Sequence, residues 1–204
     1  MAKLAFYTFA ILEETHGHPH SKGFVDRVSS VYESAERSDG FIDRAGSRNL
    51  EDLSSVWGDG SASPRFTKEH RDARPVDSSM TPEETAASDG YEAATVSIWD
   101  DLESVYAFAY NGRHSEALKK RQKWCVNPEW PSYVAWWVED GEYPTREDAG
   151  KRLEHLHDEG STPYGFDFKT PFDSAGLPWK MDRSKIQDRA QTVKAFDEEN
   201  PTGL

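Results

Sequence analysis

The side chains best suited to chemistry gather in one short segment of the chain. The segment AYNGRHSEALKKRQKW holds a single histidine, His114, between Tyr110 and Arg121. Histidine exchanges a proton near neutral pH, and tyrosine and arginine donate hydrogen bonds that can polarise a carbonyl group. A helix that begins just before His114 would place His114, Leu118 and Arg121 on one stripe. The candidate catalytic residues are therefore His114, Tyr110 and Arg121.

The same segment also has structural interpretations, which the sequence leaves open. Lys119, Lys120 and Lys123 fall on other sides of this helix, where such charges commonly form the solvated face. His114 is equally suited to a structural role, with its ring hydrogen-bonded to a nearby backbone group or carboxylate. Position on the helix thus separates His114 from the lysines but does not decide between chemistry and packing.

Aromatic side chains are abundant for so polar a chain. The sequence has seven Trp, eight Tyr and ten Phe, while its apolar fraction is only 36%. We interpret part of this set as the wall of an apolar pocket, because ligand sites are lined mainly by aromatic and apolar groups. The alternative is ordinary core packing, and strand alternation lets only one of two adjacent Trp residues face a pocket. The candidate substrate-binding residues are Tyr7, Trp99, Tyr106, Trp124, Trp136 and Trp137.

Hydrophobic periodicity predicts the elements that position these residues. The predicted strands cover residues 3–12, 41–46, 91–99 and 132–141, with a short terminal strand at 165–168. The predicted helices cover residues 21–37, 102–110, 113–125, 145–160 and a charged segment at 182–198. Asp100 with Glu103, and Thr145 with Asp148, have the spacing of N-terminal capping boxes. Residues 47–90 show little periodicity and predict a long loop, anchored by Leu53, Val56, Trp57 and Phe66.

This order predicts an α+β fold of the ferredoxin-like type, a four-stranded antiparallel sheet with helices on one face. Residues 1–168 would form the domain, with 47–90 as a loop insertion, and residues 169–204 a C-terminal arm or tail. The strands are apolar on both faces, so the second face must also be covered. We expect a second copy to cover it, which predicts a homodimer.

Charge and cysteine content exclude several classes of protein. With 37 acidic against 24 basic residues, the net charge of −13 argues against binding to nucleic acid or to an anionic membrane. No apolar run approaches the roughly 20 residues that a membrane span requires, and LAFYTFAIL is interpreted as a strand rather than a signal sequence. Cys125 is the single cysteine, which excludes an intrachain disulfide and favours a reducing, cytoplasmic location.

One histidine-rich motif could in principle bind a metal. HGHPH places His16, His18 and His20 at alternating positions, but neither a cysteine nor a carboxylate completes an obvious ligand set. A solvated turn is the favoured interpretation, and no metal or other cofactor is predicted.

Several of these motifs together resemble a known family. They are Ser97 and Trp99 at a strand end, the A-F-x-Y helix from Ala107 to Tyr110, His114, Arg121 before Trp124, the W-W-V strand at 136–138 and Pro144 in a P-T turn. Over residues 91–168, and more weakly over 1–46, the sequence resembles the family named domain of unknown function 3291. That family is placed among the dimeric α/β-barrel, antibiotic-biosynthesis-monooxygenase-like proteins. The segment 47–90 and the tail after Lys169 depart from its pattern.

The resemblance implies a range of chemistry rather than one reaction. The wider superfamily includes quinone-forming monooxygenases, haem-binding enzymes and cofactor-free isomerases and cyclases. We therefore expect a cofactor-independent enzyme that cyclises, isomerises or monooxygenates a hydrophobic secondary metabolite. The alternatives are a non-catalytic protein that carries such a metabolite and a haem protein with His114 as axial ligand.

Overall fold

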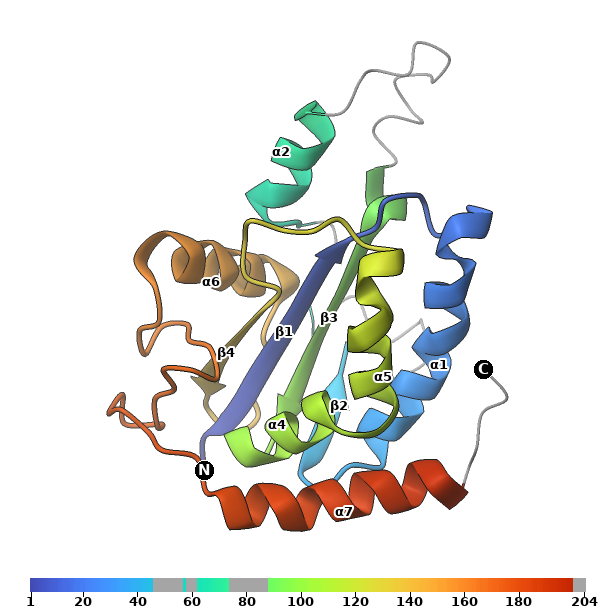
Figure 1. Ribbon diagram of the computed structural model, residues 1–204. Coiled ribbons are helices and arrows are strands. Elements are labelled where there is room, and N and C mark those ends of the chain that lie inside the picture. Colours follow the sequence, from blue (N-terminus) through green and yellow to red (C-terminus); the bar gives the residue numbers. More distant parts are fainter. Residues whose placement is uncertain (46–56, 58–61, 74–87, 200–204) are drawn as a thin grey trace.

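An antiparallel sheet forms the centre of the computed structural model, which describes residues 1–45, 57, 62–73 and 88–199. Its strands are β1 (Lys3–Ile11), β2 (Phe41–Arg44), β3 (Glu92–Trp99) and β4 (Tyr133–Val138). They lie in the order β2-β3-β1-β4, and every neighbouring pair is antiparallel (Figure 1). The predicted α+β class and four-stranded antiparallel sheet are confirmed. The predicted strand at 165–168 is reduced to two isolated bridges, from Phe166 to Ala135 and from Gly165 to Thr162.

Helices cover both faces of this sheet (Figure 1). Side chains alternate along β1, so Leu4 and Phe6 face one side and Tyr7 and Phe9 face the other. The Phe6 face is covered by α1 (Lys22–Glu36), α4 (Leu102–Tyr110) and α5 (Gly112–Lys120). The Tyr7 face is covered by α6 (Arg146–Glu159) and α2 (Arg65–Ala73).

The prediction of helices on one face only is therefore wrong. Leu153 of α6 and Phe66 of α2 are buried in the same cluster as Tyr7 and Trp136. The chain thus covers its second apolar face by itself, which removes the reason for placing a second copy there. The α2 helix was missed because its sequence, RFTKEHRDA, is polar and buries only Phe66.

Local signals place the ends of most helices. Thr145 accepts a hydrogen bond from the Asp148 backbone N–H at 3.1 Å and so caps α6 as predicted. The cap of α4 is Asp101 rather than Asp100, because its carboxylate accepts from the Ser104 N–H at 2.9 Å. Asn111 separates α4 from α5, and Gly112, with φ of 54°, is the first residue of α5. The short 3₁₀ turns are η1 (Pro19–Ser21), η2 (Ser88–Tyr91) and η3 (Arg121–Lys123).

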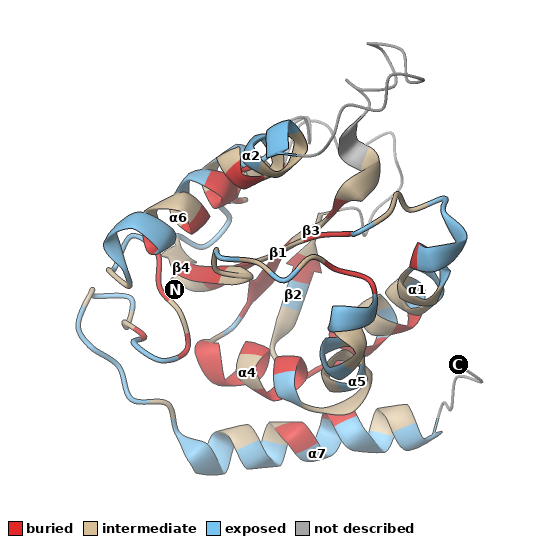
Figure 2. Ribbon diagram, turned by 45° about the horizontal axis from the view of Figure 1, so that its top comes forward, coloured by how far each residue is buried: buried red, intermediate tan, exposed pale blue. Residues whose placement is uncertain are grey.

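The C-terminal segment returns to the body of the molecule. Helix α7 (Arg183–Glu199) lies across the ends of α4 and α5 (Figures 1 and 2), and the predicted charged helix at 182–198 is confirmed. Ala190 and Val193 are its buried residues. Arg189 donates two hydrogen bonds, at 3.1 and 3.0 Å, to the carboxylate of Asp101. Trp57 and Phe66 are buried as expected for anchors of the segment 47–90, whereas Leu53 and Val56 lie outside the described residues.

Candidate functional site

A cavity of about 730 Å³ lies between the Phe6 face of the sheet and the helices α1 and α5. These two helices run side by side over this face (Figure 1). The floor of the cavity comes from alternate positions of two strands, namely Phe6, Thr8 and Ala10 of β1 and Thr95, Ser97 and Trp99 of β3. Its walls come mainly from Phe24, Val28, Val31, Tyr32 and Ala35 of α1 and from His114, Ala117 and Leu118 of α5. The lining is largely apolar, which suits a hydrophobic ligand.

His114 is a partly buried residue of this wall with a defined ring orientation. Its Nδ1 lies 2.8 Å from the carbonyl oxygen of Ala109, one of the last carbonyls of α4. Because a carbonyl can only accept, Nδ1 carries the proton and Nε2 carries the lone pair. The Nε2 atom has no hydrogen-bond partner among the described residues. The backbone bond considered in the structural interpretation is thus present, and it leaves the second nitrogen available.

Burial lowers the pKa of His114, because a desolvated site disfavours the charged imidazolium. The ring lies against Phe108, with the centroids 4.7 Å apart. Burial therefore favours the neutral form of His114 at neutral pH. A neutral imidazole with a free Nε2 can accept a proton or a hydrogen bond, or coordinate a metal.

Four other predicted site residues also line this cavity, namely Tyr110, Arg121, Trp99 and Trp124. Trp99 is buried in the floor, where its ring stacks on Phe108 at 5.3 Å and its Nε1 donates to Ser97 at 2.9 Å. Tyr110 lies at the rim, 45% exposed.

Trp124 and Arg121 bound the end of the cavity near η3. Trp124 is buried directly against α1. A Cβ at Gly23 would lie 3.0 Å from its indole ring, so the glycine permits this close contact. Arg121 is the first residue of η3 and directly follows Lys120, the last residue of α5.

The remaining predicted substrate-binding residues lie elsewhere. Tyr7 and Trp136 point to the opposite face of the sheet, where α6 and α2 cover them. Trp137 is on the cavity side of β4 but lies under the C-terminal segment, where its Nε1 donates to the Phe172 carbonyl at 2.8 Å. Tyr106 packs on Phe168 at 5.1 Å and lines a smaller, separate cavity of about 510 Å³. Sequence could not assign these faces, because apolar residues occupy both sides of the strands.

Some residues of the site were not singled out from the sequence. Tyr32 of α1 and Thr95 of β3 form a hydrogen bond between their side-chain oxygens at 2.9 Å. The guanidinium group of Arg44 lies 3.9 Å from the centroid of the Tyr32 ring. Arg27 of α1 also lines the cavity. Helical periodicity identified the inward stripe of α1, but nothing local to it indicated a cavity rather than a packed core.

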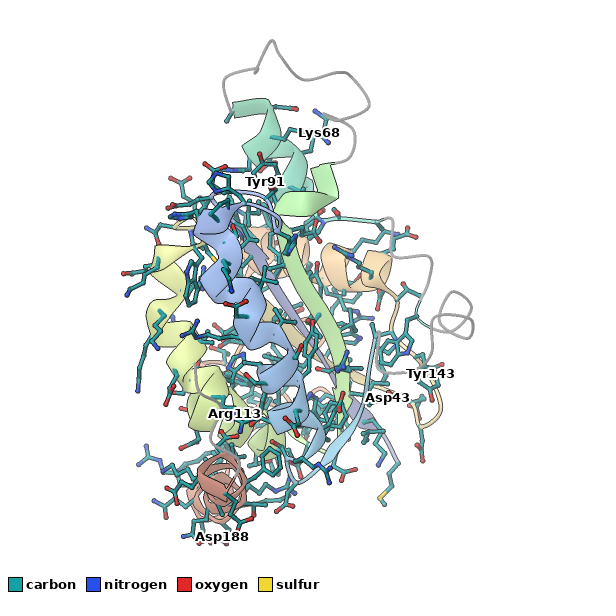
Figure 3. The ribbon with its side chains drawn as sticks, turned by 90° about the vertical axis from the view of Figure 1, so that its right-hand side faces the viewer. Asp43, Lys68, Tyr91, Arg113, Tyr143 and Asp188 are labelled. Atoms are coloured by element: carbon teal, nitrogen blue, oxygen red, sulfur yellow. The ribbon has the colours of Figure 1, made fainter. Side chains whose placement is uncertain are left out.

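An ion-pair cluster fixes the position of α5, which carries His114. Arg113 contacts Asp197 of α7 through Nε and Oδ1 at 3.3 Å, and the backbone N–H of Arg113 donates to Oδ2 of Asp197 at 2.7 Å. Arg113 also reaches α1 through Glu33, at 3.6 Å, and the Ser30 carbonyl, at 3.4 Å. Figure 3 shows its side chain between α1, α5 and α7. Since Asn111 makes no side-chain cap, Asp197 supplies the N-terminal cap of α5.

A second buried polar cluster lies on the other face of the sheet. The Glu92 side chain is 1% exposed, pairs with Arg146 of α6 and accepts from the Thr67 hydroxyl of α2 at 3.0 Å. Burial, and then the Glu92 charge, raise the pKa of Tyr7, whereas Arg146 has the opposite effect. Since Glu92 and Arg146 neutralise each other and join β3 to two helices, we interpret this cluster as structural.

The histidines of HGHPH do not form a metal-binding arrangement. Among residues 1–45, 57, 62–73 and 88–199, no group of three or more His, Cys, Asp or Glu side chains is placed to hold a metal ion. The His18 ring accepts from the His20 N–H at 3.2 Å, and His20 lies 3.2 Å from Glu13. His16 instead faces the cavity.

The chain belongs to the family described as Domain of unknown function (DUF3291), whose model matches residues 3–182. The match covers the sheet, α1, α4, α5 and α6, and it ends just before α7. Comparison with curated proteins and comparison with solved structures gave no match. In the part of the chain that the structure describes, no helix has the length and apolar character of a membrane span.

Proposed function

We propose that this protein is a cofactor-independent enzyme that acts on a small hydrophobic, ring-bearing or polyene metabolite in the cavity between the sheet and helices α1 and α5. The observation that carries the proposal is His114, a neutral imidazole that lines an apolar cavity and has a free Nε2. The sequence supports the same assignment through its resemblance to dimeric α/β-barrel proteins, among which cofactor-free isomerases and cyclases occur.

The proposed reaction begins with removal of a proton next to a carbonyl group of the substrate. The C–H bond breaks, the proton moves to Nε2 of His114, and the electron pair moves into the carbonyl to give an enolate. Return of the proton from Nε2 to another carbon gives an isomer. Attack of the enolate carbon on a second carbonyl carbon of the same molecule gives a ring, and the alkoxide that forms takes the proton back from Nε2 of His114. A monooxygenation would additionally consume O₂: one oxygen atom enters the substrate as a carbonyl group in place of two hydrogens on the same carbon, and the other leaves with those hydrogens as water.

The cavity supplies groups that suit these steps. The Ala109 carbonyl stabilises the imidazolium that forms, because it accepts the hydrogen bond from Nδ1. The hydroxyls of Tyr32 and Thr95 are polar groups on the α1 wall and on the floor, where they can orient a substrate oxygen. Orientation within such walls can lower a barrier by several kcal/mol.

The proposal can be tested with β-tetralone, a bicyclic ketone with acidic hydrogens beside its carbonyl. In D₂O, the wild-type protein should accelerate deuterium incorporation into β-tetralone, measured by NMR. His114→Ala should lose this acceleration while it still binds the ketone, as followed by tryptophan fluorescence. Lys119→Gln, on the exposed side of the same helix, is the matched control and should behave as wild type.

The outcome separates the proposed enzyme from a carrier. A wild-type protein that binds β-tetralone tightly but leaves its exchange rate at the buffer value would favour the non-catalytic carrier. Failure to bind any hydrophobic probe would contradict both.

One observation also supports the haem alternative. Histidines that ligate metals commonly donate their other N–H to a carbonyl, as His114 does. Titration with haem tests this role, because a coordinated haem gives a Soret band that His114→Ala should abolish.

The proposed site is formed by one chain, so a second copy is not required for it. The homodimer and the dimeric α/β-barrel assignment remain predictions, which light scattering on the purified protein tests. The cytoplasmic location is likewise a prediction, consistent with the single buried thiol of Cys125.

A further inference from the structure

Two arginines line the cavity without a carboxylate partner in the part of the chain described. Arg27 of α1 donates one hydrogen bond to the Gly23 carbonyl, and its guanidinium group lies 5.2 Å from the centroid of the Trp124 ring. Arg121 of η3 lies near Cys125, where its positive charge acts to lower the pKa of the thiol against the larger effect of burial. Both side chains are partly buried, and neither forms an ion pair with a described residue.

This lack of partners contrasts with the arginines around them. Arg44, on the same cavity, pairs with Glu36 at 2.8 Å, and Arg113 pairs with Glu33 and Asp197. The chain has 37 acidic residues for 24 basic ones, so partners are plentiful. A guanidinium group beside an apolar cavity loses part of its hydration, and an anion that enters the cavity would compensate this loss.

The surroundings of these two arginines suit an anion that carries rings. Trp124 is held against α1 by its contact with Gly23, and it packs edge-on against Phe24 at 6.4 Å. Its position is therefore fixed, and the guanidinium group of Arg27 lies over its ring. Guanidinium groups bind carboxylates through two parallel hydrogen bonds and also stack on aromatic rings. Both kinds of contact meet at this end of the cavity.

From this arrangement we propose that the ligand of the cavity is an amphipathic organic acid. Its anionic group binds Arg27 and Arg121 beside Trp124, and its apolar rings extend toward Trp99 and Phe108. The inference rests on the proposed function for the existence of a hydrophobic ligand, and it adds the class of that ligand.

Helix geometry also gives an approximate length for the ligand. His114 and Arg121 are seven residues apart along α5 and η3. At the rise of an α-helix, this separation is roughly 10 Å along the axis. The anionic group would therefore sit roughly 10 Å from the atom that faces His114, and it would orient the substrate without taking part in the reaction.

A matched pair of dyes tests the inference. Anilinonaphthalene sulfonate and phenylnaphthylamine share one ring system, but only the first is an anion, and both gain fluorescence in apolar sites. The wild-type protein should bind anilinonaphthalene sulfonate more tightly than it binds the neutral phenylnaphthylamine. The double variant Arg27→Gln/Arg121→Gln should lose 10-fold to 100-fold in affinity for the sulfonate, the range expected for charge-assisted hydrogen bonds, and less than about 2-fold for the neutral dye.

Two control variants make the result specific. Lys119→Gln/Lys123→Gln also removes two positive charges, but from exposed positions outside the cavity lining. This variant should leave the affinities for both dyes unchanged. Val28→Trp fills the cavity from α1 and should weaken both dyes. The two single Arg→Gln variants should each lose part of the sulfonate affinity. Affinities are compared only among variants whose free energy of unfolding equals that of the wild type.

The outcomes distinguish this inference from the proposed function. Equal loss of sulfonate affinity in the lysine control, or no loss in the arginine variant, would overturn the anion site while leaving the hydrophobic cavity in place. If neither dye binds the wild-type protein, or if Val28→Trp weakens neither, the cavity is not a ligand site and the proposed function fails with it.

Discussion

The contact between Arg113 and Asp197 gives the sharpest test of how the fold positions the candidate site. Their side chains are 9% and 11% exposed, and the carboxylate also caps α5 through the backbone N–H of Arg113. Asp197→Ala removes the charge partner and the cap together. We therefore expect a large loss of stability and a displacement of the first turn of α5, which carries His114.

The size of the loss follows from these two contributions. Removing one partner of a buried ion pair costs about 3–5 kcal/mol, and losing an N-terminal cap costs about 1 kcal/mol. Arg113 keeps Glu33 at 3.6 Å, but Glu33 is 53% exposed and compensates only in part. We expect Asp197→Ala to lower the free energy of unfolding by about 3 kcal/mol. Asp197→Asn should lose about 1 kcal/mol less, because its amide oxygen can still accept from the Arg113 N–H.

Urea unfolding followed by tryptophan fluorescence measures this loss. Asp188→Ala is the matched control, since Asp188 lies on the exposed side of α7, away from Arg113 (Figure 3), and should change stability by no more than about 0.5 kcal/mol. A loss below about 1 kcal/mol for Asp197→Ala, or one equal to that of Asp188→Ala, would refute the reasoning. In that case α7 does not hold α5, although it lies next to it.

Two further changes probe the buried titratable groups. Burial places the pKa of His114 below its ordinary 6.5, so below pH 6.5 the unfolded chain binds a proton that the folded chain does not. The free energy of unfolding should therefore fall as the pH drops from about 7 to 5, and His114→Gln should remove that part of the fall; identical pH profiles would contradict it. On the other face, Arg146→Met leaves the buried Glu92 carboxylate without its charge partner, although the Thr67 hydroxyl still donates to it, and should cost about 3–5 kcal/mol. Adding Glu92→Gln should restore much of this loss in the same urea assay. A double variant no more stable than the single one would show that the pair is not energetically coupled.

Local sequence was sufficient to predict the strands, most of the helices and the α5 wall of the cavity. Hydrophobic spacing predicted all four strands of the sheet and the helices α1, α4, α5 and α6, because each has a periodic apolar face. The spacing of His114 and Arg121 likewise predicted that they share one side of a helix, and both line the cavity. Short polar helices escaped this approach, as α2 shows, because one buried Phe66 makes no periodic pattern.

The grouping of residues from distant segments could not be predicted in the same way. Tyr7 and Phe6 are neighbours in β1 with similar aromatic side chains, yet only Phe6 faces the cavity. Both faces of the strand are apolar, so alternation does not say which side receives α1 and α5. The assignment of Trp136 to the cavity was wrong for the same reason. The second copy was expected because the sequence did not show that α6 folds back onto the Tyr7 face.

The sequence by itself determined which stretches form the strands of the sheet and the helices α1, α4, α5 and α6, that an acidic, aromatic-rich chain would bury two apolar faces, and that His114 would share a helix side with Arg121. These properties depend on backbone geometry and on neighbours within a few residues. Only the tertiary structure decided that α6 covers the Tyr7 face, that Arg27 of α1 joins Arg121 at one cavity, and that Asp197 of α7 caps the helix of His114. Those contacts join residues far apart along the chain, and their formation depends on how the whole set of elements packs.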